Sequence, residues 1–80
     1  MPVSGVVVRV ERSRREQVRQ RMEEMEGVEL QPAESPELLV ATLESAGYRQ
    51  EHELTDRIQA LEGVFGLSVA YHNFEDMVEA

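Results

Sequence analysis

Apolar and polar residues alternate along two long stretches of this chain, one near its start and one near its end. The first, residues 3–10, is rich in β-branched residues and places valines at every second position: Val6, Val8 and Val10. This period is typical of a strand with one buried face. Arg9 falls between the valines, and an arginine is easier to place toward solvent than in a small core. We therefore predict that the valine face is buried.

The second stretch, from Leu61 to His72, has two unlike faces. After a glycine turn, large side chains stand at the odd positions: Phe65, Leu67, Val69 and Tyr71. Small residues stand at the even positions between them: Gly66, Ser68 and Ala70. We predict a strand whose large face is buried and whose small face is flat and uncovered.

Two segments carry apolar residues at spacings of three and four, which is typical of one-sided helices. Ser13 and Glu16 have the spacing of a capping box, so the first helix is expected to start at Arg14, and Gly27 can end it. The second expected helix covers residues 49–61. The apolar positions are Val18, Met22 and Met25 in the first helix, and Leu54, Ile58 and Leu61 in the second.

Two further strands are expected between and beside these helices. Residues 28–31 alternate and stop at Pro32, which cannot donate to a strand ladder, so this segment is expected at a sheet edge. Residues 37–45 alternate as well. Their buried side is expected to hold Leu39, Ala41 and Leu43, and their open side Thr42 and Glu44.

A repeat within the chain predicts its topology. Met25-Glu26-Gly27-Val28 corresponds to Leu61-Glu62-Gly63-Val64, thirty-six positions later. Two strand–helix–strand units in tandem predict an α+β fold of the ferredoxin-like, split β-α-β type (βαββαβ), with both helices on one face of a four-stranded antiparallel sheet. The first and third strands should be central. Eighty residues are expected to form a single domain, 1–80, with 73–80 as a tail that can fray.

The net charge and the composition argue against several classes of binding partner. Sixteen acidic residues against eight basic ones give a formal charge of -8, which repels nucleic acid and anionic membrane surfaces. Residues 1–10 lack a basic segment leading into an apolar run, and no stretch of eighteen consecutive apolar residues occurs, so neither a secretory signal nor a membrane span is expected. The absence of cysteine suits the cytoplasm, where we expect the protein to stay.

The sequence offers little for catalysis. His52 and His72 have no serine or cysteine nucleophile nearby and no second histidine at metal-ligand spacing. A glycine-rich phosphate loop and paired cysteines for copper are both absent. Paired glutamates that could suggest a metal site are expected to be solvated: Glu23 with Glu24, and Glu51 with Glu53. We therefore expect no enzyme activity, no metal and no cofactor.

The uncovered sheet face is the remaining candidate for a functional site. We interpret it as a surface that binds a polypeptide. Small side chains let a helix approach closely, and rim carboxylates such as Glu44, Glu29 or Glu75 can pair with its arginines. A solvated face or a dimer contact remains an alternative on this pattern alone. The expected peptide-binding residues are Val7, Arg9, Val40, Thr42, Glu44, Gly66, Ser68, Ala70 and His72.

These segments together carry a family resemblance that extends from Ser4 to Asp76. Leu61-Glu62-Gly63-Val64, running into Leu67-Ser68-Val69-Ala70-Tyr71-His72 and an acidic tail, resembles the NapD family. The valine-rich first strand with Ser4, the Met25-Glu26-Gly27-Val28 counterpart and Leu38-Leu39-Val40 are similar to it as well.

The resemblance implies a cytoplasmic chaperone of ferredoxin-like fold. NapD proteins bind the twin-arginine signal peptide of the precursor of NapA, the catalytic subunit of periplasmic nitrate reductase. The implied peptide lies as a helix on the uncovered sheet face, and export waits until the molybdenum cofactor has been inserted. The alternative is a regulatory or dimerising ferredoxin-like module that binds a small metabolite at a sheet-edge interface.

Overall fold

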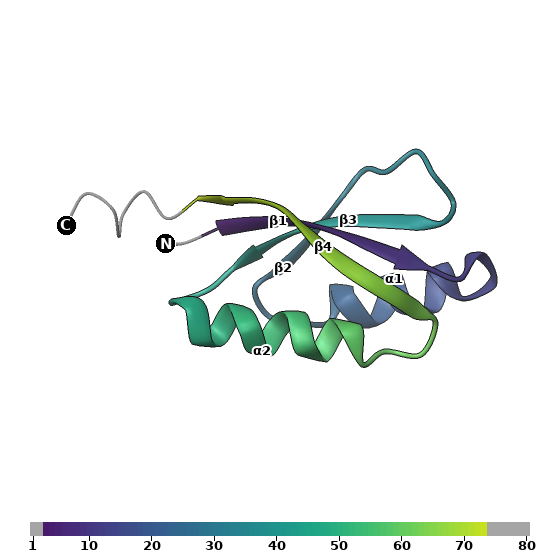
Figure 1. The fold of residues 1–80 in the computed structure, drawn as a ribbon. Helices are drawn as coiled ribbons and strands as arrows, with labels where there is room; N and C mark the ends of the chain where they lie inside the picture. Colours follow the sequence, from purple (N-terminus) through teal and green to yellow (C-terminus); the bar gives the residue numbers. More distant parts are fainter. Residues whose placement is uncertain (1–2, 74–80) are drawn as a thin grey trace.

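The predicted strands form one antiparallel sheet in a computed structural model that describes residues 3–73 (Figure 1). The strand order is β2-β3-β1-β4, so the first and third strands are central, as predicted. This arrangement confirms the α+β, ferredoxin-like fold. The elements are β1 (Val3–Val10), the short 3₁₀ helix η1 (Arg12–Arg14), α1 (Arg15–Glu23), β2 (Val28–Gln31), β3 (Leu38–Glu44), α2 (Tyr48–Gln59) and β4 (Val64–Asn73).

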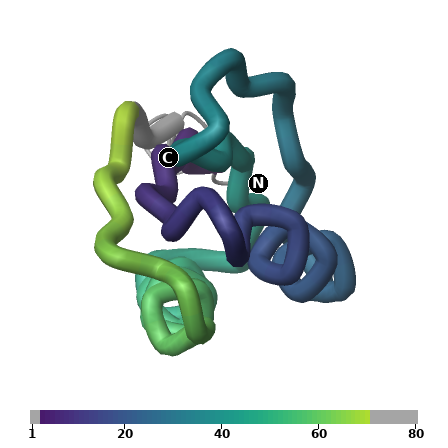
Figure 2. Tube along the Cα trace, turned by 90° about the vertical axis from the view of Figure 1, so that its right-hand side faces the viewer, coloured from purple at the N-terminus to yellow at the C-terminus, as the bar shows by residue number. Residues whose placement is uncertain are grey.

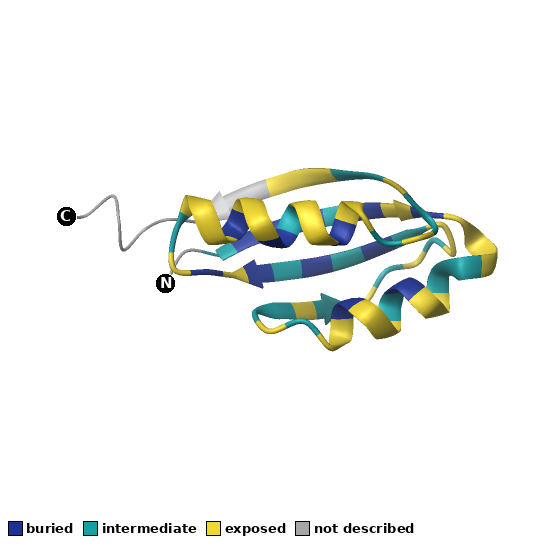
Figure 3. Ribbon diagram, turned by 90° about the horizontal axis from the view of Figure 1, so that it is seen from below, coloured by how far each residue is buried: buried dark blue, intermediate teal, exposed yellow. Residues whose placement is uncertain are grey.

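Both helices lie on the same side of the sheet, as the end-on view in Figure 2 shows. The core lies between the helices and the sheet, where Figure 3 shows the buried stripes of α1 and α2. The predicted alternation of β1 and β3 is confirmed, and the predicted helix positions are buried except for Met25 and Leu61. These two lie beyond the ends of α1 and α2 and are partly buried against the core. The buried apolar residues are Val6, Val8, Val10, Val18, Met22, Leu39, Ala41, Leu43, Leu54 and Ile58.

The predicted capping box at the start of α1 is wrong. Ser13 lies within η1, and its hydroxyl donates to Glu11 Oε1 at 3.0 Å. The 3₁₀ turn leads directly into α1, so Arg14 occupies the N-cap position, where no side chain caps the helix. Arg15 anchors this start instead, because its Nε donates to the Leu38 carbonyl oxygen at 3.1 Å.

The edge strand β4 departs from the predicted alternation. It pairs with β1 with two register shifts, which leave Phe65 and Ala70 without a partner. An unpaired residue interrupts the period of two, and β4 has a neighbouring strand on one side only. Phe65 is 69% exposed and Val69 42% exposed, so the prediction that they are buried is wrong. Leu67 pairs with Val8 and packs against the core as predicted, whereas the side chain of Tyr71 lies outside the described part.

The predicted fraying tail lies largely beyond residue 73 and therefore outside the described residues. Within residues 3–73, neither helix is both long and apolar enough to cross a membrane.

The repeated glycine has a structural role in the turn between α1 and β2. Gly27 has φ +89°, and a Cβ there would lie 2.6 Å from the Glu44 carbonyl oxygen. Its own carbonyl oxygen accepts a hydrogen bond from the Glu44 amide at 2.8 Å. Gly63, its counterpart in the repeat, has φ +98°. Both positions therefore favour glycine because of backbone conformation.

Replacing Gly27 with alanine should lower the free energy of unfolding by about 2 kcal/mol or more, because the left-handed backbone is strained and the new Cβ meets a backbone carbonyl. Urea unfolding measures this effect. Gly47→Ala is the matched control, since Gly47 has an extended backbone and nothing lies within 4 Å of the added Cβ. Equal losses in the two variants would contradict the assigned role of Gly27.

Candidate functional site

The sheet face opposite the helices is not covered by any other helix or strand of residues 3–73 (Figure 1). We call this surface the open face. Cross-strand pairing sets its rows, since paired residues of antiparallel strands share a face. The rows along β1 are Val3 with Glu44, Gly5 with Thr42, Val7 with Val40 and Ser68, and Arg9 with Leu38 and Gly66.

The central row is shallow and largely apolar. Val7 pairs with Val40 on one side and with Ser68 on the other; Val7 and Val40 are half-buried, and Ser68 is exposed. None of these residues is larger than valine. A helix laid across this row can therefore bring its backbone close to the sheet and bury apolar surface on it.

One end of the open face is acidic. A hollow of about 370 Å³ lies there, lined by Val3, Gly27, Val28, Glu29, Thr42 and Glu44. Glu29 and Glu44 are both exposed. Glu29 is held by its neighbours, because its Oε1 accepts a hydrogen bond from Gln31 Nε2 at 3.2 Å, and its carbonyl oxygen lies 3.5 Å from Thr42 Oγ1. Two carboxylates beside one hollow can bind guanidinium groups.

The opposite end carries a positive charge. The Arg9 side chain extends across Gly66, where its Nη2 would lie 2.8 Å from an added Cβ. The missing side chain at Gly66 therefore leaves room for the guanidinium group. Arg9 is exposed and forms no ion pair with a carboxylate of residues 3–73.

The structure groups most of the predicted peptide-binding residues on the open face. Seven share its rows: Val7, Arg9, Val40, Thr42, Glu44, Gly66 and Ser68. Ala70 is exposed but lies at the second register shift, without a partner in β1.

His72 was predicted to lie in a row of the open face, and the pairing of β4 with β1 places its backbone in a different row. The shift at Ala70 pairs His72 with Ser4 instead of with the Gly5 row, and Ser4 pairs in turn with the buried Leu43. The side chain of His72 lies outside the described part, as does Glu75, the third expected rim carboxylate.

Glu51 is the polar residue that sequence reasoning misjudged. It was expected to be solvated, yet it is only 8% exposed and accepts a hydrogen bond from the Ser4 hydroxyl. The pair ties α2 to β1 on the helix side of the sheet. Its spacing of three and seven positions before Leu54 and Ile58 places it on the buried stripe of α2, and this was the signal available in the sequence.

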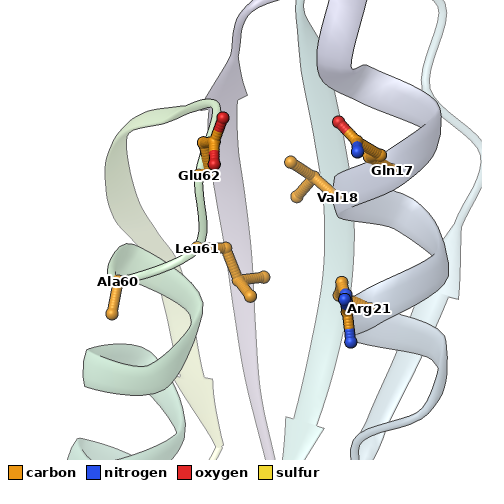
Figure 4. Close-up of a pocket in the computed structure, with 6 residues that line it drawn as sticks. All are labelled: Gln17, Val18, Arg21, Ala60, Leu61 and Glu62. Carbon is orange, nitrogen blue, oxygen red and sulfur yellow. The ribbon is translucent and has the colours of Figure 1, made fainter.

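The helix side carries a different kind of surface. A hollow of about 300 Å³ lies between the helices, where Val18 and Leu61 point toward each other from opposite sides (Figure 4). Gln17, Arg21, Ala60 and Glu62 complete its lining. No histidine, serine or cysteine is among the residues that line it.

Three charged side chains form ion pairs on the exposed face of α1. Arg19 contacts Glu16 and Glu23, the second at 2.8 Å. The hydrogen bond from Arg19 lowers the pKa of the Glu16 carboxyl, and the same bond raises the pKa of Arg19. The arginine of this triad is thus neutralised by its own helix, unlike Arg9. Within the described residues, no three side chains of His, Cys, Asp or Glu form a group that could hold a metal ion.

Comparisons with known proteins agree with this geometry. A family model described as NapD protein matches residues 1–76. A comparison with curated proteins found no significant match. Among solved structures, the chain is similar to the solution structure of the E. coli Tat proofreading chaperone protein NapD, with a TM-score of 0.79 and 21% sequence identity. That match covers 92% of this chain and 79% of the other. At this identity the structural likeness establishes the fold.

Proposed function

Because this chain belongs to the NapD family, we propose that it is a cytoplasmic chaperone that binds the twin-arginine signal peptide of the NapA precursor. NapA is the catalytic subunit of periplasmic nitrate reductase. Bound to the signal, the chaperone holds back export until the molybdenum cofactor has been inserted. The similar E. coli structure is named as a Tat proofreading chaperone, which supports this role. The proposal includes neither a cofactor bound by this chain nor an enzymatic step.

The observation that carries the proposal is the uncovered row of Val7, Val40 and Ser68. A twin-arginine signal has an apolar run, which needs an apolar surface to lie on when it is not in a membrane. Burying about 300 Å² of apolar surface contributes roughly 7 kcal/mol at 25 cal/mol per Å², before the cost of ordering the peptide. Apolar burial alone therefore falls short of the about 8 kcal/mol that micromolar binding requires, so the charged contacts at the end of the face must contribute as well.

The arginines of the signal have partners at the acidic end of the same face. Glu29 and Glu44 border one hollow and are exposed, so their carboxylates can accept bidentate hydrogen bonds from guanidinium groups. The formal charge of -8 also attracts a basic peptide over a longer range. Binding should therefore weaken as the salt concentration rises.

Calorimetric titration with a synthetic twin-arginine signal peptide of a NapA precursor tests the proposal. We expect a dissociation constant of about 1 μM or lower, which corresponds to about -8 kcal/mol. A peptide with both arginines replaced by alanine is the matched control and should bind more weakly. Absence of binding by the native peptide to the folded protein would contradict the proposed function.

A further inference from the structure

The two ends of the open face carry opposite charges, and we propose that this polarity sets the direction of the bound peptide. Arg9 receives the C-terminal end of the peptide helix, and the twin arginines lie at the end with Glu29 and Glu44. The peptide then runs alongside β1 and in the same direction. This inference rests on the function proposed above and specifies how the partner is oriented on the same surface.

Arg9 lies at one end of the open face with its charge unpaired among the described residues. Its guanidinium group extends over Gly66 on the open face, and it has no carboxylate partner within residues 3–73. Several arginines elsewhere are neutralised, as Arg14 is by Glu11 and Glu62. The full charge of Arg9 is therefore available to whatever occupies the face beside it.

The two ends of a bound peptide helix carry opposite partial charges. The last turn of a helix exposes carbonyl oxygens and carries about half a negative charge, so a cation beside it is favourable. The arginines of the signal lie at the other, N-terminal end of its apolar run. In the proposed direction both ends meet opposite charge. In the reverse direction the signal arginines would face Arg9, and the helix C-terminus would face Glu29 and Glu44.

The length of the open face matches the length of a short peptide helix. The Arg9 row and the Val3 row are six positions apart along β1, which is about 20 Å at 3.3 Å per residue. A helix covers about 20 Å with roughly 13 residues. An apolar run of that length, with arginines at its N-terminal end, therefore reaches both charged ends of the open face at once.

Paramagnetic labelling tests the direction. A nitroxide is attached to the signal peptide either just before the arginines or just after the apolar run, and the amide signals of isotopically labelled protein are recorded. We expect the first label to broaden Glu29, Thr42 and Glu44, and the second to broaden Arg9, Leu38 and Gly66. The opposite pattern with intact binding would overturn the direction and leave the proposed function standing. Absence of binding would contradict the proposed function itself.

Two variants separate the charge of Arg9 from its bulk. Arg9→Lys keeps the charge, so each label should still broaden one end only. Arg9→Glu removes the difference between the ends, so each label should broaden both ends as the reverse direction becomes populated. Arg9 is exposed, so neither substitution should disturb the fold, and the amide spectrum of each free variant checks this. An unchanged one-ended pattern in Arg9→Glu would overturn the role of Arg9.

Discussion

Replacing Ser68 with arginine is expected to weaken binding of the twin-arginine signal peptide by about 100-fold or more, equivalent to about 2.8 kcal/mol. Ser68 pairs with Val7 in the central row, where the peptide helix is proposed to lie closest to the sheet. An arginine there blocks that approach, loses hydration when the peptide binds, and repels the arginines of the signal. Calorimetric titration measures the loss.

The fold should survive this substitution, because Ser68 is exposed and lies on the face opposite the core. Gln59→Arg is the matched control, since it adds the same charge at an exposed position of α2 on the helix side. It should bind the peptide with nearly native affinity. Equal affinity of the two variants would show that the peptide does not occupy the central row.

Replacing Ile58 with alanine should lower the free energy of unfolding by about 3 to 4 kcal/mol. Ile58 is fully buried between α2 and the sheet, and the hydrophobic core of this small protein is itself small. The substitution removes three methyl or methylene groups and leaves a cavity that close packing cannot fill. Since a domain of this size has about 4 to 12 kcal/mol of stability in total, the loss is a large part of it.

Urea unfolding followed by circular dichroism measures this loss. Ile58→Val is the matched control, because it removes a single methylene group and should cost about 1 kcal/mol. Met22 occupies the corresponding position in the first half of the repeat and is also fully buried, so Met22→Ala should behave like Ile58→Ala. A loss below 1 kcal/mol in Ile58→Ala would mean that α2 contributes much less to the core than its burial indicates.

The strand order and the core were predictable because both depend on simple periods. Alternating valines in β1 and the apolar spacing of α1 and α2 require one buried face each, and the repeat arranges these faces around one sheet. The turn glycines were predictable for a similar reason. Gly27 and Gly63 occupy equivalent positions, and both have the left-handed conformation that favours glycine.

The details of β4 were not predictable from the pattern. Large residues at odd positions indicated one continuous buried face, but pairing with β1 leaves Phe65 and Ala70 without partners. A bulge is set by how two strands fit together, which the period of one strand does not contain. For this reason Phe65 is exposed and His72 pairs outside the predicted row, whereas Val69 pairs with Val6 and is exposed at the edge of the sheet.

The candidate site was predictable in its centre and less so at its ends. Val7, Val40 and Ser68 follow from strand alternation, and the structure pairs them across three strands. The placement of Arg9 over Gly66 depends on side-chain packing between neighbouring strands, and the burial of Glu51 depends on its contact with Ser4. Helical spacing indicates that Glu51 faces the core, but neither its partner Ser4 nor the contact of Arg9 with Gly66 can be read from spacing along the chain.

The most direct test of the account is to map the signal peptide by amide chemical shifts on the isotopically labelled protein. We expect the largest shifts along the open face, at Val7, Val40, Thr42 and Ser68. Residues of the hollow between the helices, such as Arg21 and Ala60, should change little. Largest shifts in that hollow, with the open face unchanged, would contradict the claim that the uncovered sheet face binds the signal.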